Sequence, residues 1–189
     1  MILIKKIIRR LENYESSYKF IRFCEKNFGK REINYKNNIL FEFNSLSSAI
    51  VCYAYLSNVL SKKYNSNIIA YNPYLIPFIK LPYLVIKNYL SLNYKVWKSF
   101  GVKKIIYPKL NSDQISEAEK ITNKIYEKIN CKQDVENIKI ENVWIGDLIY
   151  DSYLRENMLP TININSSSFK KFLNKSVKLY VFWRDYIIN

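Results

Sequence analysis

The chain has 189 residues and a formal net charge of +14, and its 49% hydrophobic and 16% aromatic residues allow a core of its own, which excludes disorder and a disulfide-stapled miniprotein. It contains no histidine, which excludes Ser-His-Asp and Cys-His catalysis and the HExxH zinc helix. Its three glycines lie too far apart for a GxGxxG or P-loop motif, and its three cysteines form no CxxC pair, so we expect no metal site and a reducing, cytoplasmic location.

The first predicted element is a helix over residues 1–28, which with the polar linker after it forms an N-terminal segment of residues 1–37. Its apolar residues recur at helical spacing, at Ile4, Ile7, Ile8 and Leu11. Lysines and arginines interrupt this stretch where an export signal needs an uninterrupted apolar core. We therefore expect no signal peptide.

Residues 38–72 are expected to form a βαβ unit. The short apolar run ILFEF at residues 39–43 is typical of a strand that is covered on both faces, as in a parallel sheet. A helix over residues 47–63 and a second strand over residues 67–71 follow it. Because the crossover brings both strands into one parallel sheet, residues 38–189 are predicted to form a Rossmann-like α/β domain with helices flanking the sheet.

The stretch of residues 71–97 is rich in aromatic and aliphatic residues, but we do not expect it to span a membrane. Prolines and lysines interrupt it, whereas a membrane-spanning helix needs about 20 predominantly apolar residues. Pro77 and Pro82 instead favour a broken loop followed by a helix over residues 83–99. A third strand is predicted over residues 103–107.

The remaining elements are mainly helical. Residues 112–130 predict an amphipathic helix with a buried apolar stripe and a solvated polar face. A second helix is predicted over residues 143–157, and a short extended piece over residues 161–164 follows it. The final helix is expected over residues 169–186, with the serines at 166–168 placed to cap it.

Four segments resemble one family of bacterial proteins. They are ILFEFN at residues 39–44, AYLS at 54–57, WKSFGV at 97–102 and WIGDLIYDSYLR at 144–155. The last is similar to the Gly-Asp-Leu-Ile-Tyr-Asp-x-Tyr-Leu-Arg signature of capsule and surface-polysaccharide biosynthesis proteins of the glycosyltransferase type. The order of the segments resembles the N-terminal half of these proteins, and the resemblance extends from about residue 38 to the end of the chain.

The resemblance implies a role in the biosynthesis of a surface polysaccharide, capsule or lipopolysaccharide. Such proteins are similar to two-domain (GT-B-like) glycosyltransferases, in which two Rossmann-like halves enclose a cleft. The chain then corresponds to the acceptor-side domain, with a glycan or lipid-linked acceptor as its partner and no cofactor of its own. The missing C-terminal domain is expected to bind the nucleotide-sugar donor. We therefore expect the chain alone to be inactive, and its sequence identifies no catalytic base.

The signature contains one group of candidate ligand-binding residues. Asp147, Asp151 and Arg155 are spaced i, i+4, i+8, which places them along one side of a helix. Two carboxylates and a guanidinium suit the hydroxyls of a sugar or a phosphate group. The alternative is structural, because Asp151 and Arg155 also have the spacing of an ordinary helical ion pair.

The second candidate site is the loop between the first strand and the helix after it, with Asn44, Ser45, Ser47 and Ser48. Ligands of open α/β sheets bind at the carboxyl ends of the strands, and free amides at a helix N-terminus attract anions. The alternative is that these residues simply cap the helix, since asparagine and serine are preferred N-caps.

Lysines and aromatic residues occur together in two parts of the chain, a mixture suited to sugars or membrane headgroups. The first part could equally be buried against the sheet; it comprises Tyr71, Tyr74, Phe78, Lys80, Tyr83, Lys87 and Tyr89. The second is the final helix, with Lys170, Lys171, Lys175 and Lys178. An anionic membrane surface is therefore a candidate partner, and peripheral attachment to the inner membrane is an alternative to a free cytoplasmic location.

Nucleic acid is the other polyanion that a charge of +14 attracts. A basic nucleic-acid-binding α/β protein is the second hypothesis, but no recognisable module supports it, so nucleic acid is not the expected partner. A nonfunctional truncated remnant is the third hypothesis. The many Lys, Ile, Asn and Tyr residues have A/T-rich codons, which offers a compositional origin for part of the charge.

Overall fold

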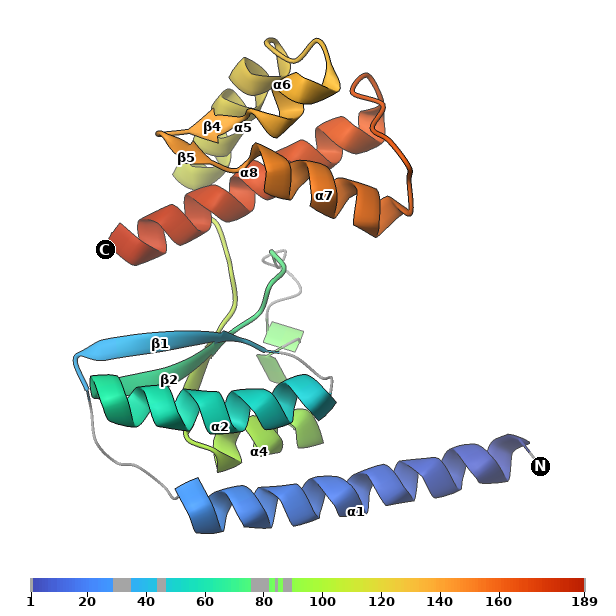
Figure 1. The fold of residues 1–189 in the computed structure, drawn as a ribbon, viewed down its shortest axis with the longest axis vertical. Coiled ribbons are helices and arrows are strands. Elements are labelled where there is room, and N and C mark those ends of the chain that lie inside the picture. Colours follow the sequence, from blue (N-terminus) through green and yellow to red (C-terminus); the bar gives the residue numbers. More distant parts are fainter. Residues whose placement is uncertain are drawn as a thin grey trace. The chain divides into compact units, whose positions relative to one another are not determined.

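The computed structural model describes residues 2–28, 35–43, 47–75, 82–83, 85–86 and 90–188. It contains two compact units, Met1–Tyr107 and Pro108–Asn189, each with its own hydrophobic core (Figure 1). No shift of composition marks this division. The N-terminal helix belongs to the unit that contains the parallel sheet, and the segment after Tyr107 forms the other unit.

The first unit is built on a parallel sheet of three strands in the order β1-β2-β3. The strands are β1 (Asn37–Glu42), β2 (Ser66–Tyr71) and β3 (Val102–Ile106). Helix α2 (Ser47–Tyr64) connects the first two, so the predicted βαβ unit is confirmed. The predicted α/β class, a parallel sheet flanked by helices, is therefore correct, and this architecture is compatible with a Rossmann-like fold.

Helices α2 and α4 (Leu92–Ser99) cover one face of this sheet, and α1 (Ile2–Phe28) packs on the outside of them (Figure 1). Trp97 of α4 is completely buried at the centre of this core and packs against Phe43, the residue after β1, with a centroid distance of 5.4 Å. This aromatic contact helps to hold α4 against the sheet. The predicted helix over residues 83–99 is interrupted, because Ser91 caps α4 by accepting the Tyr94 N–H at 3.1 Å.

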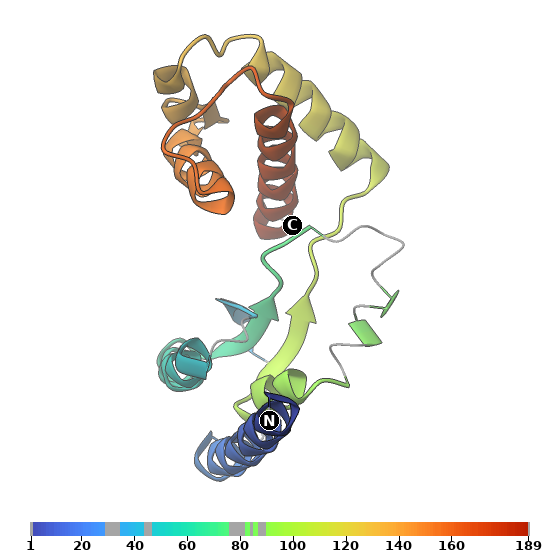
Figure 2. The same cartoon turned by 90° about the vertical axis from the view of Figure 1, so that its right-hand side faces the viewer.

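The second unit combines four helices with a two-stranded hairpin among the described residues. Its elements are α5 (Ser112–Tyr126), α6 (Lys132–Glu136), β4 (Lys139–Ile140), β5 (Val143–Trp144), α7 (Gly146–Asn157) and α8 (Ser167–Ile188). Helix α8 lies between α5 and α7 (Figure 2). It buries one residue per turn on a single stripe, namely Phe169, Leu173, Val177 and Val181.

Several predicted boundaries in this unit were wrong for local reasons. The helix predicted over residues 143–157 begins three residues later, because Val143–Trp144 pairs with Lys139–Ile140 as a hairpin. Glu141 and Asn142 form its turn, with positive φ values of 50° and 68°. Residues 161–164, predicted to be extended, are not assigned to a strand.

Side-chain caps begin the two long helices of this unit. Asn111 caps α5: its side chain accepts the Gln114 N–H at 2.8 Å, and the Gln114 side chain accepts the Asn111 N–H at 3.0 Å. The final helix agrees with expectation, since Ser166 Oγ accepts the Phe169 N–H at 3.2 Å. Among the residues that the structure describes, no helix is long and apolar enough to cross a membrane.

Candidate functional site

The site is built on α7, and Gly146 fixes the start of that helix. A Cβ at this position would collide with the backbone carbonyl oxygens of Val135 and Glu136. The N–H groups of Ile145 and Gly146 both donate to the carbonyl of Ile138 at 3.1 Å. The glycine of the signature is therefore explained by close packing of α7 against the backbone of α6 and the residues after it.

Tyr153 holds the other half of α7 in place. Its ring is 2% exposed and packs edge-on against Phe169 and Phe172, with centroid distances of 5.4 and 5.3 Å. Its hydroxyl shares a hydrogen bond of 2.7 Å with Ser168 Oγ, at the start of α8. Burial with a satisfied hydroxyl ties the two helices together. The tyrosine of the signature is thus part of the core.

The opposite side of α7 carries Asp147, Asp151 and Arg155, all of which are exposed. Asp147 lies in the first turn, where its carboxylate accepts the Leu148 N–H at 2.8 Å and complements the positive end of the helix. Within the described part of the chain, the side chains of Asp151 and Arg155 have no hydrogen-bond or ion-pair partner. The ion pair that their spacing allows is therefore not formed.

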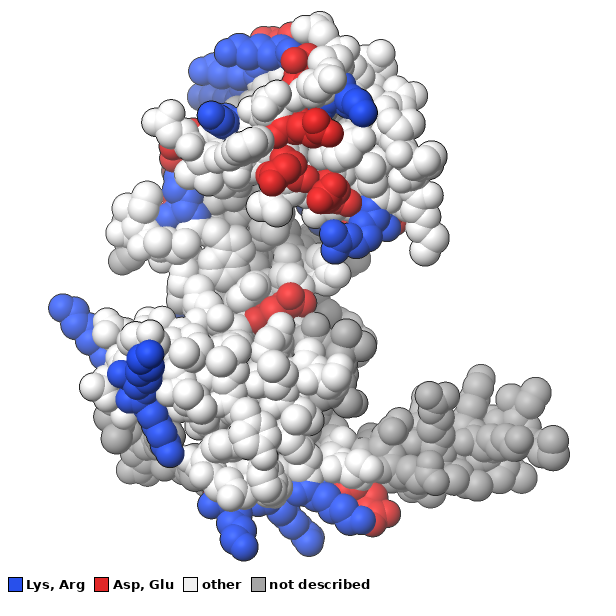
Figure 3. All heavy atoms as spheres, viewed as in Figure 1, with Lys and Arg blue, Asp and Glu red and all other residues white. Residues whose placement is uncertain are grey.

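This side of α7 offers an acceptor and a donor to a ligand. A carboxylate accepts hydrogen bonds from sugar hydroxyls, and a guanidinium donates to oxygens of a phosphate or a carboxylate. Figure 3 shows acidic side chains gathered on the face of the second unit that carries α7, with basic side chains beside them. Among the described residues, no three potential metal ligands cluster.

Two exposed apolar side chains lie near the start of α7. Leu148 of α7 is 65% exposed, and Trp144 at the end of the hairpin is 57% exposed. The indole N–H donates to the Glu136 carbonyl at 2.5 Å, which holds the ring in one orientation. A fixed and exposed aromatic ring offers an apolar surface beside polar groups, as ligand sites commonly do.

The candidate loop site of the first unit lies partly outside the described residues. Asn44 and Ser45 lie outside the described residues, Ser47 begins α2, and Ser48 in its first turn is exposed. At the same edge of the sheet, the Asn72 side chain accepts the Tyr74 N–H at 2.9 Å. Ligand binding by this loop stays a prediction.

Three tyrosines of the lysine-aromatic stretch are among the described residues. Tyr74 and Tyr83 are 60% and 66% exposed, and Tyr71 is half-buried on β2. Burial, followed by the nearby carboxylate of Glu42, raises the pKa of Tyr71. The remaining predicted members, Phe78, Lys80, Lys87 and Tyr89, lie outside the described residues. Membrane attachment through this stretch stays a prediction.

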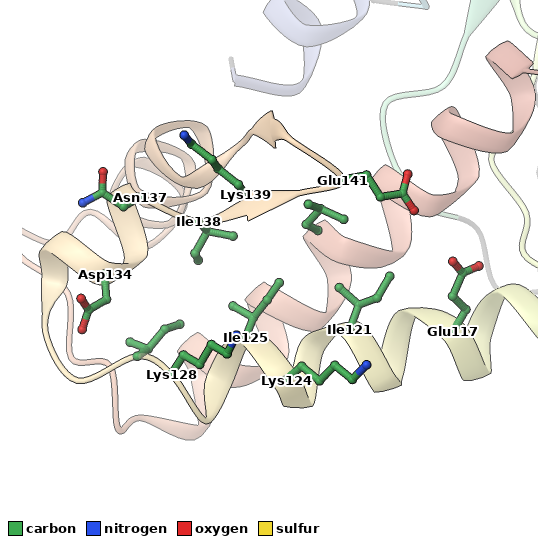
Figure 4. Close-up of a pocket in the computed structure, with 12 residues that line it drawn as sticks. Glu117, Ile121, Lys124, Ile125, Lys128, Asp134, Asn137, Ile138, Lys139 and Glu141 are labelled. Carbon is green, nitrogen blue, oxygen red and sulfur yellow. The ribbon is translucent and has the colours of Figure 1, made fainter.

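A second candidate site, not predicted from the sequence, is a groove in the second unit (Figure 4). It has a volume of about 600 Å³ and lies between α5 and the segment of α6 and β4. Its lining consists of isoleucines, lysines, acids and one asparagine: Glu117, Ile121, Lys124, Ile125, Lys128, Ile129, Asp134, Asn137, Ile138, Lys139, Ile140 and Glu141. The polar face of α5 was expected to be simply solvated, but Lys124 of α5 lines this groove, as does Lys128 in the turn after the helix.

Arg184 of α8 organises the charges at one end of the groove. Its guanidinium lies 2.7 Å from the carboxylates of Glu117, Glu141 and Asp185, and the side chain is 15% exposed. The hydrogen bond from Arg184 lowers the pKa of Glu117, and those from Gln114 and Arg184 lower the pKa of Asp185. One side chain therefore connects α5, the hairpin and α8.

The buried cysteine of the first unit is unsuited to catalysis. Cys24 of α1 is completely buried in the first core, and burial raises the pKa of its thiol to about 11. The thiol is protonated at neutral pH and has no access to substrate.

Comparison of the chain with family models, with curated proteins and with solved structures finds no match.

Proposed function

We propose that this chain is the acceptor-side half of a glycosyltransferase-like protein of surface-polysaccharide biosynthesis, and that the exposed side of α7 binds the acceptor. The observation that carries this proposal is the division of the signature between two sides of one helix. Packing explains Gly146, Ile149 and Tyr153, whereas Asp151 and Arg155 are exposed and have no partner among the described residues. Exposed charged groups that make no contact within the protein are available to a ligand.

The chemistry of these groups suits a carbohydrate or phosphate-bearing acceptor. Asp151 accepts hydroxyl hydrogen bonds and Arg155 donates to phosphate or carboxylate oxygens, and the exposed Leu148, three residues before Asp151 on the same helix, offers an apolar surface. The resemblance of residues 144–155 to the signature of polysaccharide biosynthesis proteins supports the same assignment. In this proposal, the nucleotide-sugar donor is bound by a second domain.

The test is complementation of a strain from which the gene has been deleted, with surface polysaccharide measured on stained gels. Asp151→Asn and Arg155→Lys are each expected to lower the amount about tenfold or more, because a lost charge-assisted hydrogen bond costs about 1.5–3 kcal/mol. Glu156→Gln on the same helix makes a similar change of charge and serves as the matched control. Its only described partner is Lys175 at 3.5 Å, on the exposed surface.

The cellular level of each variant is measured in parallel, so that loss of protein is not mistaken for loss of binding. Normal polysaccharide with both Asp151→Asn and Arg155→Lys would contradict the proposal. So would an equal loss with Glu156→Gln, because the effect would then not be specific to the exposed side that carries Asp151 and Arg155.

A further inference from the structure

The groove beside α5 contains three acids, and all of them have partners within the second unit. Glu117 and Glu141 each lie 2.7 Å from the guanidinium of Arg184. Asp134 accepts the backbone N–H groups of Asn130 and Cys131 at 2.8 and 2.9 Å, and these bonds lower its pKa. Hydrogen bonds within the protein therefore hold all three carboxylates in place, and the single guanidinium of Arg184 balances one of the negative charges around it.

The three lysines of the groove are differently placed. Lys124 lies on α5 and Lys128 in the turn that follows it; both are exposed, and neither side chain has a hydrogen-bond or ion-pair partner in the described part of the chain. Lys139 on β4 lies 5.9 Å from the centre of the Trp144 ring, a contact that leaves its charge uncompensated. The rim of the groove therefore carries ammonium groups that no described carboxylate contacts.

The floor of the groove is apolar. Ile138 and Ile140 are each 5% exposed, and Ile121, Ile125 and Ile129 are half-buried. Figure 4 shows Ile125 of α5 and Ile138 pointing toward one another across the groove. Its volume of about 600 Å³ lies within the range of small-molecule pockets, which is about 300–1,000 Å³.

We propose that this groove binds a single-chain amphiphile with an anionic head group. The alkyl chain lies on the isoleucine floor, and the head group meets the ammonium groups of Lys124 and Lys128. An uncharged alkyl chain would make no ion pair with the lysines, and a small anion would make no contact with the isoleucines of the floor. The site shares no residue with Asp151 and Arg155, so the inference stands independently of the proposed function.

The experiment is calorimetric titration of the full chain with octyl phosphate, at concentrations at which the amphiphile is monomeric. We expect one molecule to bind per chain, and octanoate to bind as well if the head group is recognised only by its charge. Lys124→Gln/Lys128→Gln is expected to weaken binding about tenfold, as loss of two exposed charge pairs implies. The control Lys120→Gln/Lys171→Gln removes the same charge from exposed positions outside the groove and should bind like the parent chain.

Two further probes separate the contributions of chain and charge. Butyl phosphate should bind more than about tenfold more weakly than octyl phosphate, because each buried methylene contributes about 0.8 kcal/mol. Octyltrimethylammonium, with the same chain and the opposite charge, should not bind measurably. Methyl NMR with labelled isoleucine should show octyl phosphate perturbing Ile121, Ile125 and Ile129.

The possible contrary results each overturn the inference. Absence of binding by both octyl phosphate and octanoate would do so. Equal weakening in the two double variants would show nonspecific attraction to a basic protein, and equal binding of inorganic phosphate would show an ion site only. Perturbation of isoleucines in the first unit instead of the groove would place the ligand elsewhere.

Discussion

Two arginines of the second unit, Arg184 on α8 and Arg155 on α7, lie in opposite environments. Arg184 is 15% exposed and is surrounded by three carboxylates at 2.7 Å, whereas Arg155 is exposed and has no partner among the described residues. The first arginine contributes to the fold by joining elements that are distant in sequence. The second is a charge that the fold does not use, which is the property expected of a ligand-binding residue.

The largest effect on stability is expected from a substitution at the start of α7, the helix that carries Arg155. Gly146→Ala places a Cβ against the carbonyls of Val135 and Glu136, so α7 must move or the backbone of α6 must shift. We expect the free energy of unfolding to fall by about 3 kcal/mol, as for severe overpacking. Urea unfolding followed by circular dichroism measures it, with the exposed Ser152→Ala on the same helix as control. Equal stability of the two variants would show that α7 does not depend on this contact.

The next effect is expected at Arg184 and depends on pH. Arg184→Met removes the partner of Glu117, Glu141 and Asp185, and we expect a loss of about 2 kcal/mol at pH 7. Because Arg184 lowers the pKa of Glu117 and Asp185 in the folded state, the parent chain gains stability above their ordinary values of 4.5 and 3.8. That gain is lost as the pH falls through the lowered folded values.

The measurement is thermal unfolding between pH 7 and pH 3, and Arg184→Met should show a smaller decrease over this interval than the parent chain. High salt should reduce the difference, since parts of the cluster are exposed. Parallel pH profiles for the two chains would contradict the assignment of the cluster to stability.

The arginine comparison also shows what the sequence could predict. The βαβ unit was predictable because its strand is a continuous apolar run, and α8 because its buried residues recur every four positions. The Arg184 cluster was not, since its guanidinium meets carboxylates 67 and 43 residues away. Such pairs depend on tertiary packing, which a local pattern does not encode.

The hairpin and the groove were missed for related reasons. Strands of two residues are too short to show alternation, and the turn at Glu141–Asn142 lacks the glycine that usually marks one. The groove needs β4 to pack beside α5, so it could not be predicted without the hairpin. The one available signal was the pair Lys124 and Lys128, spaced one turn apart beside the isoleucine stripe of α5.

The sequence predicted that the candidate residues on α7 lie together, but it did not predict whether they pair with one another or are available to a ligand. Helical spacing placed Asp147, Asp151 and Arg155 on one side. It did not distinguish a ligand role from an ion pair between the last two, because that distinction depends on the orientation of long side chains. The structure shows that this pair is not formed, and it leaves the ligand role as a prediction.

The smallest effect on stability is expected at Arg155 itself, and it completes the comparison with Arg184. Arg155→Met makes the same substitution in the same unit, yet it removes no described hydrogen bond or ion pair. We expect the free energy of unfolding to change by no more than about 0.5 kcal/mol, the usual range for an exposed position. Urea unfolding of Arg155→Met, Arg184→Met and the parent chain under one set of conditions measures the contrast. A loss at Arg155 equal to that at Arg184 would mean that Arg155 has a structural partner in solution, and its role as a ligand-binding residue would lose its support.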